Sequence, residues 1–396
     1  MGASCARRLG GGAGYTRRVS STHFDVILVG GGIAGSAAAL RTAQYHHLRA
    51  LWILGDKQTA KRSRGQWVAN IDNMVGIHDG IVRKKATKIL RAKKFAEARA
   101  VLEARGRESI STRDIIESTI ERIGEEYVDQ VTMLGATATG ARLRDDARGF
   151  VVTADDTEYE SRYLVLATGV MDRQPHIKKQ RGKVVVDDPR WIYPFANRES
   201  VLYCIRCEGH LTRGTKTAVI GQSESAAQLA LMLHERYESA SCVLTNGQPP
   251  EWRERTGRLL TAYAIDVHSE RIVDVAGERG TLHVLRLDGG MEIAVRFALI
   301  SLGLHRVYNG LARALGADLE ASELPEDERH VLIEHNGATS IPGLFAIGDM
   351  TKRRDGEVVM KQVYTAQEYA VRAIDSIDGA IRSARRHAIL GEPAPF

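Results

Sequence analysis

The chain has 396 residues, 43% of them hydrophobic and 26% charged, and this composition predicts two or more domains with apolar cores. No run of about 18 uninterrupted apolar residues occurs, which excludes a transmembrane helix and membrane partners. The four cysteines argue against a disulfide-stapled secreted protein and favour a reducing, cytoplasmic compartment. The net charge of +6 favours acidic partners without requiring them, and we expect no nucleic-acid partner.

The first 21 residues differ from the rest of the chain. They are rich in Gly, Arg, Ser and Ala, and no acidic residue precedes Asp25. Such a composition cannot bury a core, so we predict a disordered tail. An organellar transit peptide is also Arg-rich and acid-poor and remains the alternative. Myristoylation at Gly2 is not predicted, because Ala6 stands where Ser or Thr is required.

A glycine-rich loop follows residues 24–29, an apolar run typical of a buried parallel strand. Gly30, Gly32 and Gly35 form the pattern G-x-G-x-x-G, and residues 36–45 after it favour a helix. Glycines at these positions allow a tight turn and bring backbone amides to a pyrophosphate at the helix N-terminus. The loop therefore predicts a dinucleotide site.

The residues after this helix strengthen the prediction. A second apolar strand is predicted at residues 51–54, and Asp56 follows it. An acid about 20 residues beyond the glycines is expected to bind the ribose of the adenosine. Strand, loop, helix, strand and acid thus occur in the order that a βαβ nucleotide-binding unit requires.

Residues 82–108 are dense in Lys and Arg interleaved with Ala, with few periodic apolar positions. They predict a solvated helical insertion, and the alternative is an electrostatic docking face for an acidic electron-donor protein. Residues 111–123 predict an amphipathic helix with its isoleucines on one side. Strands are then predicted at residues 131–133, 149–153 and 158–163, followed by an apolar run, 164–167, that ends in Thr168 and Gly169.

Cys204 and Cys207 are spaced as Cys-x-x-Cys at the start of a helical turn. Helix-terminal amides and nearby positive charge favour thiolates there, so the pair can close a disulfide and exchange two electrons. The alternatives are two buried apolar side chains, or half of a zinc site completed by His210. Zinc usually takes two such pairs, and the chain has only Cys5 and Cys242 besides, singly and far away. We therefore predict a redox-active dithiol and no metal.

A second βαβ unit follows with a degraded glycine pattern. Residues 217–220 predict its strand, and a helix runs from the loop to about residue 236. Ser223 replaces the central glycine, and Glu224 adds negative charge where a pyrophosphate would lie. The next strand contains Cys242, which we expect to pack in the core, and ends at residues 245–247 with neither an acid nor an Arg pair. A site for NAD(P)H is possible here but degraded.

The last part of the chain is predicted to return to the first sheet. After strands at residues 282–287 and 295–302, residues 341–349 form a strand ending in Gly348 and Asp349. Lys361, Gln362 and Val363 begin a helix that we expect to run through Asp375. The fold class predicted is α/β, with two Rossmann-like domains, the second inserted into a discontinuous first. The expected boundaries are a tail at 1–21, an FAD-type domain at 22–170 and 303–396, the Cys-x-x-Cys domain at 171–302, and hinges near 170–174 and 303–306.

In this order the motifs resemble the flavin-dependent thioredoxin reductase family, the low-molecular-weight class of pyridine nucleotide-disulfide oxidoreductases. The resemblance covers residues 22–380. It implies FAD on the first domain, a homodimer, and a thioredoxin-like protein or a small-molecule disulfide or dithiol as partner. It rests on the glycines at 30, 32 and 35, on Thr168 and Gly169, on the pair Cys204 and Cys207, on Gly348 and Asp349, and on the helix of Gln362.

The resemblance also implies roles for individual residues. Asp349 would lie near the ribityl chain and Gln362 near the isoalloxazine, with Lys361 where relatives often have Arg. Cys207 would face the flavin, and Cys204 would attack the substrate disulfide. Glu208 would be the proton donor, where thioredoxin reductases usually carry Asp, and His210 a second proton carrier.

This chain departs from that family at the second nucleotide site, which leaves the electron donor open. We predict an FAD-dependent thiol-disulfide oxidoreductase in which two electrons pass between FAD and the couple of Cys204 and Cys207. Relatives that oxidise small dithiols with oxygen, and relatives that take electrons from ferredoxin, provide two alternatives. An alternative of another class is a non-catalytic flavoprotein redox sensor.

Overall fold

The computed structural model describes residues 21–60, 63–68, 71, 73–74, 111–146, 148–181, 184–196, 200–278 and 280–393. The predicted tail, apart from Ser21, and the basic segment 82–108 lie outside these residues. The chain forms two compact units. Unit 1 comprises Met1–Ser63, Asp114–Met171 and Arg306–Phe396, and unit 2 comprises Arg64–Arg113 and Asp172–His305.

Unit 1 is built on a seven-stranded sheet of order β3-β2-β1-β6-β5-β4, with β20 also paired to β6. The pairs β1–β2, β2–β3, β1–β6 and β6–β20 are parallel, whereas β4 and β5 join in antiparallel pairing. Its strands are β1 (His23–Val29), β2 (Ala50–Ile53), β3 (Val131–Leu134), β4 (Ala138–Leu143), β5 (Phe150–Ala154), β6 (Thr157–Leu166) and β20 (Leu344–Ala346).

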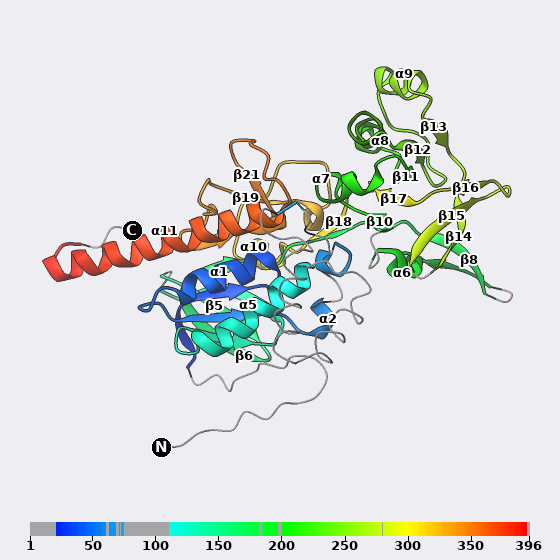
Figure 1. Ribbon diagram of the computed structural model, residues 1–396. Helices are drawn as coiled ribbons and strands as arrows, with labels where there is room; N and C mark the ends of the chain where they lie inside the picture. The colour runs from blue at the N-terminus through cyan, green and yellow to red at the C-terminus, as the bar shows by residue number, and fades with distance from the viewer. Residues whose placement is uncertain are drawn as a thin grey trace, which may run out of the picture. The chain divides into compact units, whose positions relative to one another are not determined.

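The strand β20 returns to the first sheet, as the sequence predicts, because Leu344 pairs with Leu164 in parallel register. Helix α11 (Val363–Leu390) then packs along α1 (Ile33–Ala43), and Figure 1 shows it as the long red helix. Arg41 of α1 donates from Nε to Oδ1 of Asp375 at 2.7 Å, which ties the two helices together. The predicted fold class is confirmed.

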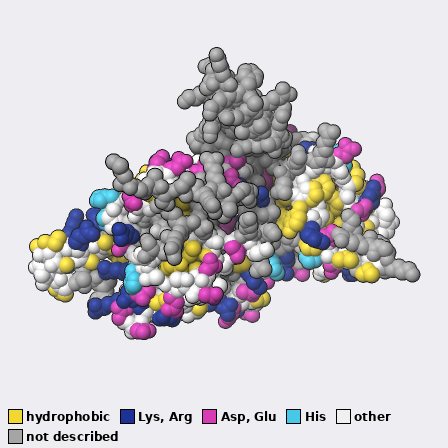
Figure 2. Space-filling view, turned by 90° about the horizontal axis from the view of Figure 1, so that it is seen from below, with side chains coloured by type: hydrophobic (Ala, Val, Ile, Leu, Met, Phe, Trp, Pro, Cys, Tyr) yellow, Lys and Arg dark blue, Asp and Glu magenta, His cyan; other side chains and the backbone are white. Residues whose placement is uncertain are grey.

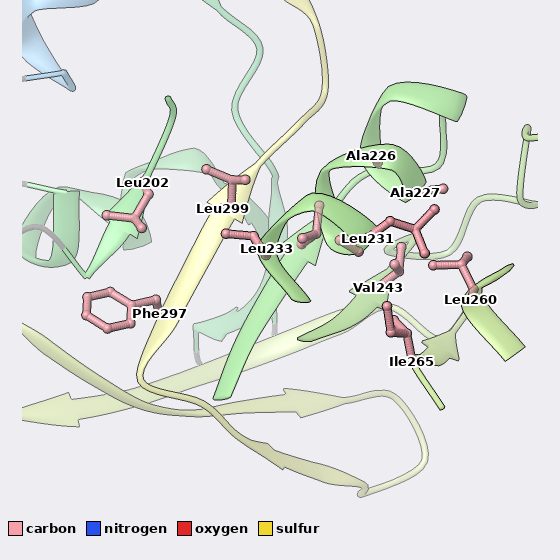
Figure 3. Packing of buried hydrophobic residues seen from close by; sticks show 12 residues of the cluster. Leu202, Ala226, Ala227, Leu231, Leu233, Val243, Leu260, Ile265, Phe297 and Leu299 are labelled. Atoms are coloured by element: carbon pink, nitrogen blue, oxygen red, sulfur yellow. The ribbon is translucent and has the colours of Figure 1, made fainter. Parts of the chain in front are cut away.

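Unit 2 contains a five-stranded parallel sheet of order β10-β17-β11-β12-β13. Helix α8 (Glu224–Tyr237) packs its alanines and leucines against β12 and β11, as Figure 3 shows for Ala227, Leu231 and Leu233. Cys242 on β12 is buried, as expected, and burial raises the pKa of its thiol to about 11. The strands are β10 (Val201–Leu202), β11 (Lys216–Ile220), β12 (Ala240–Leu244), β13 (Asp266–His268) and β17 (Phe297–Ile300).

The remaining elements, of which α5 is the longest, complete the two units. The helices are α2 (Lys57–Ala60), α5 (Thr112–Glu126), α6 (Tyr193–Ala196), α7 (Ile205–Glu208), α9 (Glu254–Ala262) and α10 (Gly310–Ala314), with the 3-10 turns η1 (Arg64–Gln66), η2 (Pro189–Ile192), η3 (Gly209–Thr212), η4 (Glu326–Glu328) and η5 (Gly348–Met350). The strands are β7 (Val170–Asp172), β8 (Ile177–Arg181), β9 (Val184–Asp188), β14 (Ile272–Glu278), β15 (Thr281–Leu287), β16 (Glu292–Ala294), β18 (Leu304–Val307), β19 (Val331–Ile333) and β21 (Thr351–Arg353).

One part of the chain groups differently from the sequence expectation. The segment from Arg64 to Arg113 was expected in the first domain, whereas it clusters with unit 2. Among the described residues of this segment, Arg64 forms an ion pair with Asp172 at 2.8 Å, and Trp67 stacks on Tyr193 with ring centroids 4.4 Å apart, both within unit 2.

Besides the crossings after Ser63 and after Arg113, the chain passes from one unit to the other after Met171 and after His305. The last two crossings lie in β7 and β18, which pair with each other as a two-stranded sheet. They fall within the segments 170–174 and 303–306 that the sequence analysis names as hinges. Their motion stays a prediction.

Candidate functional site

The glycine loop of unit 1 joins β1 to α1 at the carboxyl edge of the parallel strands. Gly30 has φ +130°, and a Cβ there would stand 2.2 Å from the carbonyl oxygen of Ala167. A Cβ on Gly35 would stand 1.9 Å from the oxygen of Gly30. Both glycines are therefore required by close backbone packing.

Gly32 differs from its neighbours because an added Cβ would meet nothing within 4 Å in the described structure. It is the N-cap of α1, has φ −84° and ψ −171°, and supplies no side-chain cap to the helix. The first turn of α1 also carries no acidic residue. Open space before uncapped helix amides is the arrangement that receives a pyrophosphate.

The other predicted FAD residues at this edge follow strands next to β1. Thr168 and Gly169 come directly after β6, and the Thr168 hydroxyl donates to the carbonyl of Tyr308 at 2.6 Å. Gly348 has φ +75°, and a Cβ there would stand 2.9 Å from the Cβ of Ala34 in α1. Gly348 therefore lies against the first turn of α1, with the partly exposed Asp349 next in the chain.

Asp56 follows β2, also at this edge, and its side chain is exposed. Its Oδ1 accepts from the amides of Gln58 at 2.9 Å and Thr59 at 2.8 Å, so it caps the short helix α2. These bonds from Thr59 lower the pKa of the carboxyl group. The structure thus shows a capping role, and the ribose contact stays a prediction.

Lys361, Gln362 and Val363 begin α11, with buried Gln362 as the N-cap. The Gln362 side-chain amide donates to the carbonyl of Lys361 at 2.9 Å. Helix α11 contacts η5, which contains Gly348 and Asp349. Unit 1 therefore brings all the predicted FAD residues to one edge of its sheet and to the start of α11.

In unit 2, Cys204 and Cys207 form a disulfide with Cα atoms 5.3 Å apart, as the spacing predicts. Cys204 is the N-cap of α7, and its sulfur accepts from the Cys207 amide at 3.3 Å. Cys207 is only 7% exposed, whereas Cys204 is half-buried. The two residues therefore differ in exposure, and Cys204 is the more exposed of the two.

Buried polar groups surround the disulfide. The carboxylate of Glu208, 3% exposed, accepts from the amides of Tyr203 at 3.0 Å and Cys204 at 3.2 Å. The Tyr203 hydroxyl donates to Oε1 of Gln174 at 2.6 Å, and burial raises the pKa of that phenol. His210 lies in η3 with an exposed side chain. Glu208 therefore holds the loop that carries Cys204, and His210 stands at the surface.

Asn73 is a site residue that the sequence analysis did not identify. Its Nδ2 lies 3.9 Å from the Cys207 sulfur, within the range of a weak hydrogen bond to sulfur. The contact joins positions 134 residues apart, and neither periodicity nor a local motif signals it. An amide that donates to Cys207 would favour its thiolate once the disulfide is reduced.

The second glycine loop, between β11 and α8, keeps only part of the pattern. Gly221 matches Gly30, because a Cβ there would stand 2.3 Å from the Ser301 oxygen. Ser223 caps α8 by accepting from the Ala226 amide at 3.4 Å. Whereas the N-terminus of α1 has no side-chain cap, that of α8 has one.

Glu224 is held by the segment that precedes and begins α9. Its carboxylate accepts from the Arg253 amide at 2.9 Å, from the Thr256 hydroxyl at 2.7 Å and from Gln228 at 3.0 Å. The bonds from Arg253 and Thr256 lower the pKa of Glu224, so it is charged at neutral pH. A fixed negative charge at the N-terminus of α8 repels a pyrophosphate.

The polar side chains that follow β12 form hydrogen bonds with nearby backbone groups. The Thr245 hydroxyl donates to the carbonyl of Gln248, and Asn246 Oδ1 accepts from the Ile272 amide at 2.8 Å. Arg271 lies against Gly247, where its Nε would be 2.9 Å from an added Cβ. The sequence analysis missed this cation because it comes from beyond β13 rather than from the strand end itself.

Comparison with known proteins places the chain in a family. Residues 24–370 match the pyridine nucleotide-disulphide oxidoreductase family, and the chain belongs to it. Bound FAD and a pyridine nucleotide partner are both consistent with this family of oxidoreductases.

The individual relatives are distant. One component of the alkyl hydroperoxide reductase of Staphylococcus epidermidis is 24% identical over 379 residues, which cover 91% of this chain and 60% of that protein. The thioredoxin reductase of Streptococcus pyogenes superposes with a TM-score of 0.68 at 18% identity, covering 92% of this chain and all of that one. The putative thioredoxin reductase TrxB of Bacillus anthracis gives 0.66 at 19%, covering 91% and 99%. These likenesses show the fold.

The described residues contain neither a candidate membrane-spanning helix nor a candidate metal cluster. No described helix combines the length and apolar character needed to cross a bilayer. Among the described residues, no group of three or more His, Cys, Asp or Glu side chains could hold a metal ion. Figure 2 shows one face of the molecule, and on its described part Lys and Arg side chains are interspersed with Asp and Glu.

Proposed function

We propose that the protein is an FAD-dependent thiol-disulfide oxidoreductase. Two electrons pass between FAD held by unit 1 and the couple of Cys204 and Cys207 in unit 2. They then pass to or from a thioredoxin-like protein or a small disulfide or dithiol. The observation that supports this best is the disulfide itself, with one cysteine buried and the other more exposed.

The residues of unit 1 fit FAD. Open space at Gly32 before the uncapped α1 suits the pyrophosphate, and Asp349 and Gln362 lie further along the same edge. Bound FAD would supply a two-electron carrier that a dithiol can reduce and that, once reduced, a disulfide can oxidise. The protein residues hold it, orient it and set its surroundings.

Thiol-disulfide exchange at the couple follows from the exposure of its cysteines. In the reduced state, the Cys204 thiolate attacks a substrate disulfide, forms a mixed disulfide and releases one substrate thiolate, which takes a proton. The Cys207 thiolate then attacks the Cys204 sulfur. The bond between Cys204 and the substrate breaks, the second substrate thiol leaves, and the internal disulfide forms again. Asn73 would stabilise the Cys207 thiolate that this second step requires.

Glu208 and His210 are the proton carriers that we propose. In the disulfide state Glu208 Oε2 accepts two amide bonds, which keep the carboxylate beside the loop of Cys204. The exposed ring of His210 can exchange protons with water. We place the protein in a reducing compartment such as the cytoplasm, because the couple works by cycling between dithiol and disulfide, and we propose a homodimer.

The residues of the second unit bear on which molecule donates electrons to the flavin. The charged Glu224 and the capping Ser223 oppose a dinucleotide at α8, so we propose that NADPH is a poor donor. Ferredoxin as donor, or oxygen as acceptor of electrons from a dithiol substrate, would fit this arrangement.

The test is anaerobic reduction of the flavin by NADPH, NADH, reduced ferredoxin and a small dithiol, each followed separately by absorbance. We expect the dithiol or ferredoxin to reduce the flavin at least about tenfold more efficiently than NADPH. Turnover with a disulfide substrate distinguishes an enzyme from a redox sensor, because a sensor would be reduced once without turnover. Rapid reduction by low NADPH concentrations would instead support an ordinary NADPH-linked reductase.

A further inference from the structure

Four charged or titratable side chains of unit 1 form a continuous chain that ends at the start of α11. Lys361 Nζ lies 2.9 Å from His330 Nε2, and His330 Nδ1 lies 2.6 Å from Glu320 Oε1. The other carboxylate oxygen of Glu320 accepts from Lys352 Nζ at 2.7 Å. These residues come from the loop after α10, the residue before β19, strand β21 and the residue before the N-cap of α11.

The two central side chains of this hydrogen-bonded series, His330 and Glu320, are largely buried, and more than one bond holds them together. The side chains of His330 and Glu320 are 16% and 10% exposed. Glu320 Oε1 also accepts from the His330 amide at 2.9 Å, and the Glu320 amide donates to the His330 carbonyl at 2.9 Å. The imidazole therefore has a fixed position relative to the carboxylate.

The charges of the neighbours set the tautomer of His330. Burial and the positive charge of Lys361 lower the pKa of His330, with a smaller contribution from Lys352, and outweigh the opposing effect of Glu320. Burial alone would raise the pKa of Glu320, but hydrogen bonds from Lys352 and His330 bring it to about 2. At neutral pH the ring is therefore neutral, donates from Nδ1 to the carboxylate, and accepts at Nε2 from the Lys361 ammonium.

We propose that Glu320 and His330 position Lys361 as the cation beside the flavin. Lys361 precedes the buried N-cap Gln362 of α11, and α11 contacts η5, whose Gly348 lies against Ala34 of α1 beside the glycine loop. A cation held there favours the negative charge that the flavin gains on reduction. This inference rests on the proposed FAD site in unit 1. His330 acts through Lys361 and is a positioning residue.

The test is the flavin midpoint potential of the full-length protein with bound FAD, measured by equilibration with reference dyes. We expect Lys361→Met to lower the equilibrium constant for two-electron reduction about tenfold, which is a shift of about 30 mV to a more negative potential. His330→Leu should give about a threefold loss, and His330→Gln should restore most of it by offering Lys361 an acceptor. Arg372→Met, which removes an exposed cation of α11 that pairs with Glu368 outside this cluster, is the control and should change the constant less than twofold.

A second measurement does not depend on the flavin. Nitrogen NMR of the FAD-free protein should show His330 with its proton on Nδ1, and Glu320→Gln should disturb that tautomer while the protein stays folded. If His330→Leu leaves the potential unchanged while Lys361→Met shifts it, His330 does not position Lys361. If neither variant shifts it although FAD is bound, Lys361 is not beside the flavin, and the proposed function still stands. If the unaltered protein binds no FAD, the proposed function itself fails.

Discussion

Gly32 offers the sharpest test of the FAD site, because a side chain there would disturb a ligand without disturbing the fold. An added Cβ meets nothing within 4 Å, and the extended φ and ψ are accessible to valine. The cost to folding of Gly32→Val is therefore mainly that of a poorer N-cap, about 1 kcal/mol. The same side chain would occupy the space in front of the α1 amides.

The expected effect on binding is much larger than the effect on stability. Displacing the pyrophosphate would remove about two charge-assisted hydrogen bonds of about 1.5–3 kcal/mol each. The loss of about 3–6 kcal/mol weakens FAD binding by roughly 10²- to 10⁴-fold. Equilibrium dialysis with FAD, together with thermal unfolding of the FAD-free proteins, measures the two effects separately.

Two further glycines serve as controls for this experiment. Gly379→Ala lies within α11, where an added Cβ also meets nothing within 4 Å, and should leave FAD content and stability nearly unchanged. Gly35→Ala should prevent folding, because its Cβ would stand 1.9 Å from the Gly30 oxygen. Full FAD occupancy in Gly32→Val would refute the assignment of this loop.

The other predictions concern the cysteines and the second unit. Cys204→Ser should develop long-wavelength flavin absorbance as the Cys207 thiolate forms, whereas Cys207→Ser should not. If Cys204→Ser shows no such band over a broad pH range, Cys207 does not face the flavin. Cys242, whose pKa is about 11, stays a protonated and buried thiol at neutral pH, so mass spectrometry should find it unalkylated until the protein is unfolded, and rapid labelling of the folded protein would contradict its burial. The double variant with Ser223→Gly and Glu224→Ala should accept electrons from NADPH at least about tenfold faster in stopped-flow reduction, because a like charge and a capping side chain are gone; an unchanged rate would mean that these residues do not limit NADPH.

Local signals in the sequence predict the two βαβ units well, and one strand shows where such signals mislead. A strand was predicted at residues 158–163, with an apolar run at 164–167 after it, whereas both belong to the single strand β6, Thr157–Leu166. Residues 157–159 pair only with β5, in antiparallel register, and residues 160 and 161 pair with β5 on one side and β1 on the other; burial in this first part alternates. Its last residues lie between β1 and β20 and are all buried. One strand thus carries two patterns because its neighbours change.

The end of α11 was also predicted wrongly. The helix continues fifteen residues beyond the expected end at Asp375, to Leu390, and stops at Gly391 with φ +69°. A left-handed glycine is a common helix terminator, and the signal was present in the sequence. Asp375 instead lies mid-helix, where it accepts from Arg41 and from the Tyr45 hydroxyl.

Contacts between distant parts of the chain were beyond any local pattern. Asn73 reaches Cys207, Arg271 reaches Gly247, and His330 joins Glu320 to Lys361. Each depends on how loops fold back onto a sheet edge, and no periodicity or spacing rule encodes that. The motif residues therefore identify the chemistry, and the neighbours that tune it come from the structure.

The two βαβ units of this chain show how small a change separates a nucleotide site from a helix that only supports a fold. Both units place a glycine where a Cβ would strike a backbone oxygen, at 2.2 Å for Gly30 and 2.3 Å for Gly221, so both keep the tight turn. They differ at the helix start, where Gly32 leaves α1 without a side-chain cap, whereas Ser223 caps α8 and Glu224 is bound by the Arg253 amide and the Thr256 hydroxyl. The amide end of α8 thus stabilises the protein's own side chains, and the amide end of α1 is left to an anionic ligand. Both units therefore keep the same turn, and they differ in whether the helix start is free of side-chain caps. Under the proposed function, we expect the partner that exchanges electrons with the couple of Cys204 and Cys207 to be a dithiol or a donor protein rather than a dinucleotide.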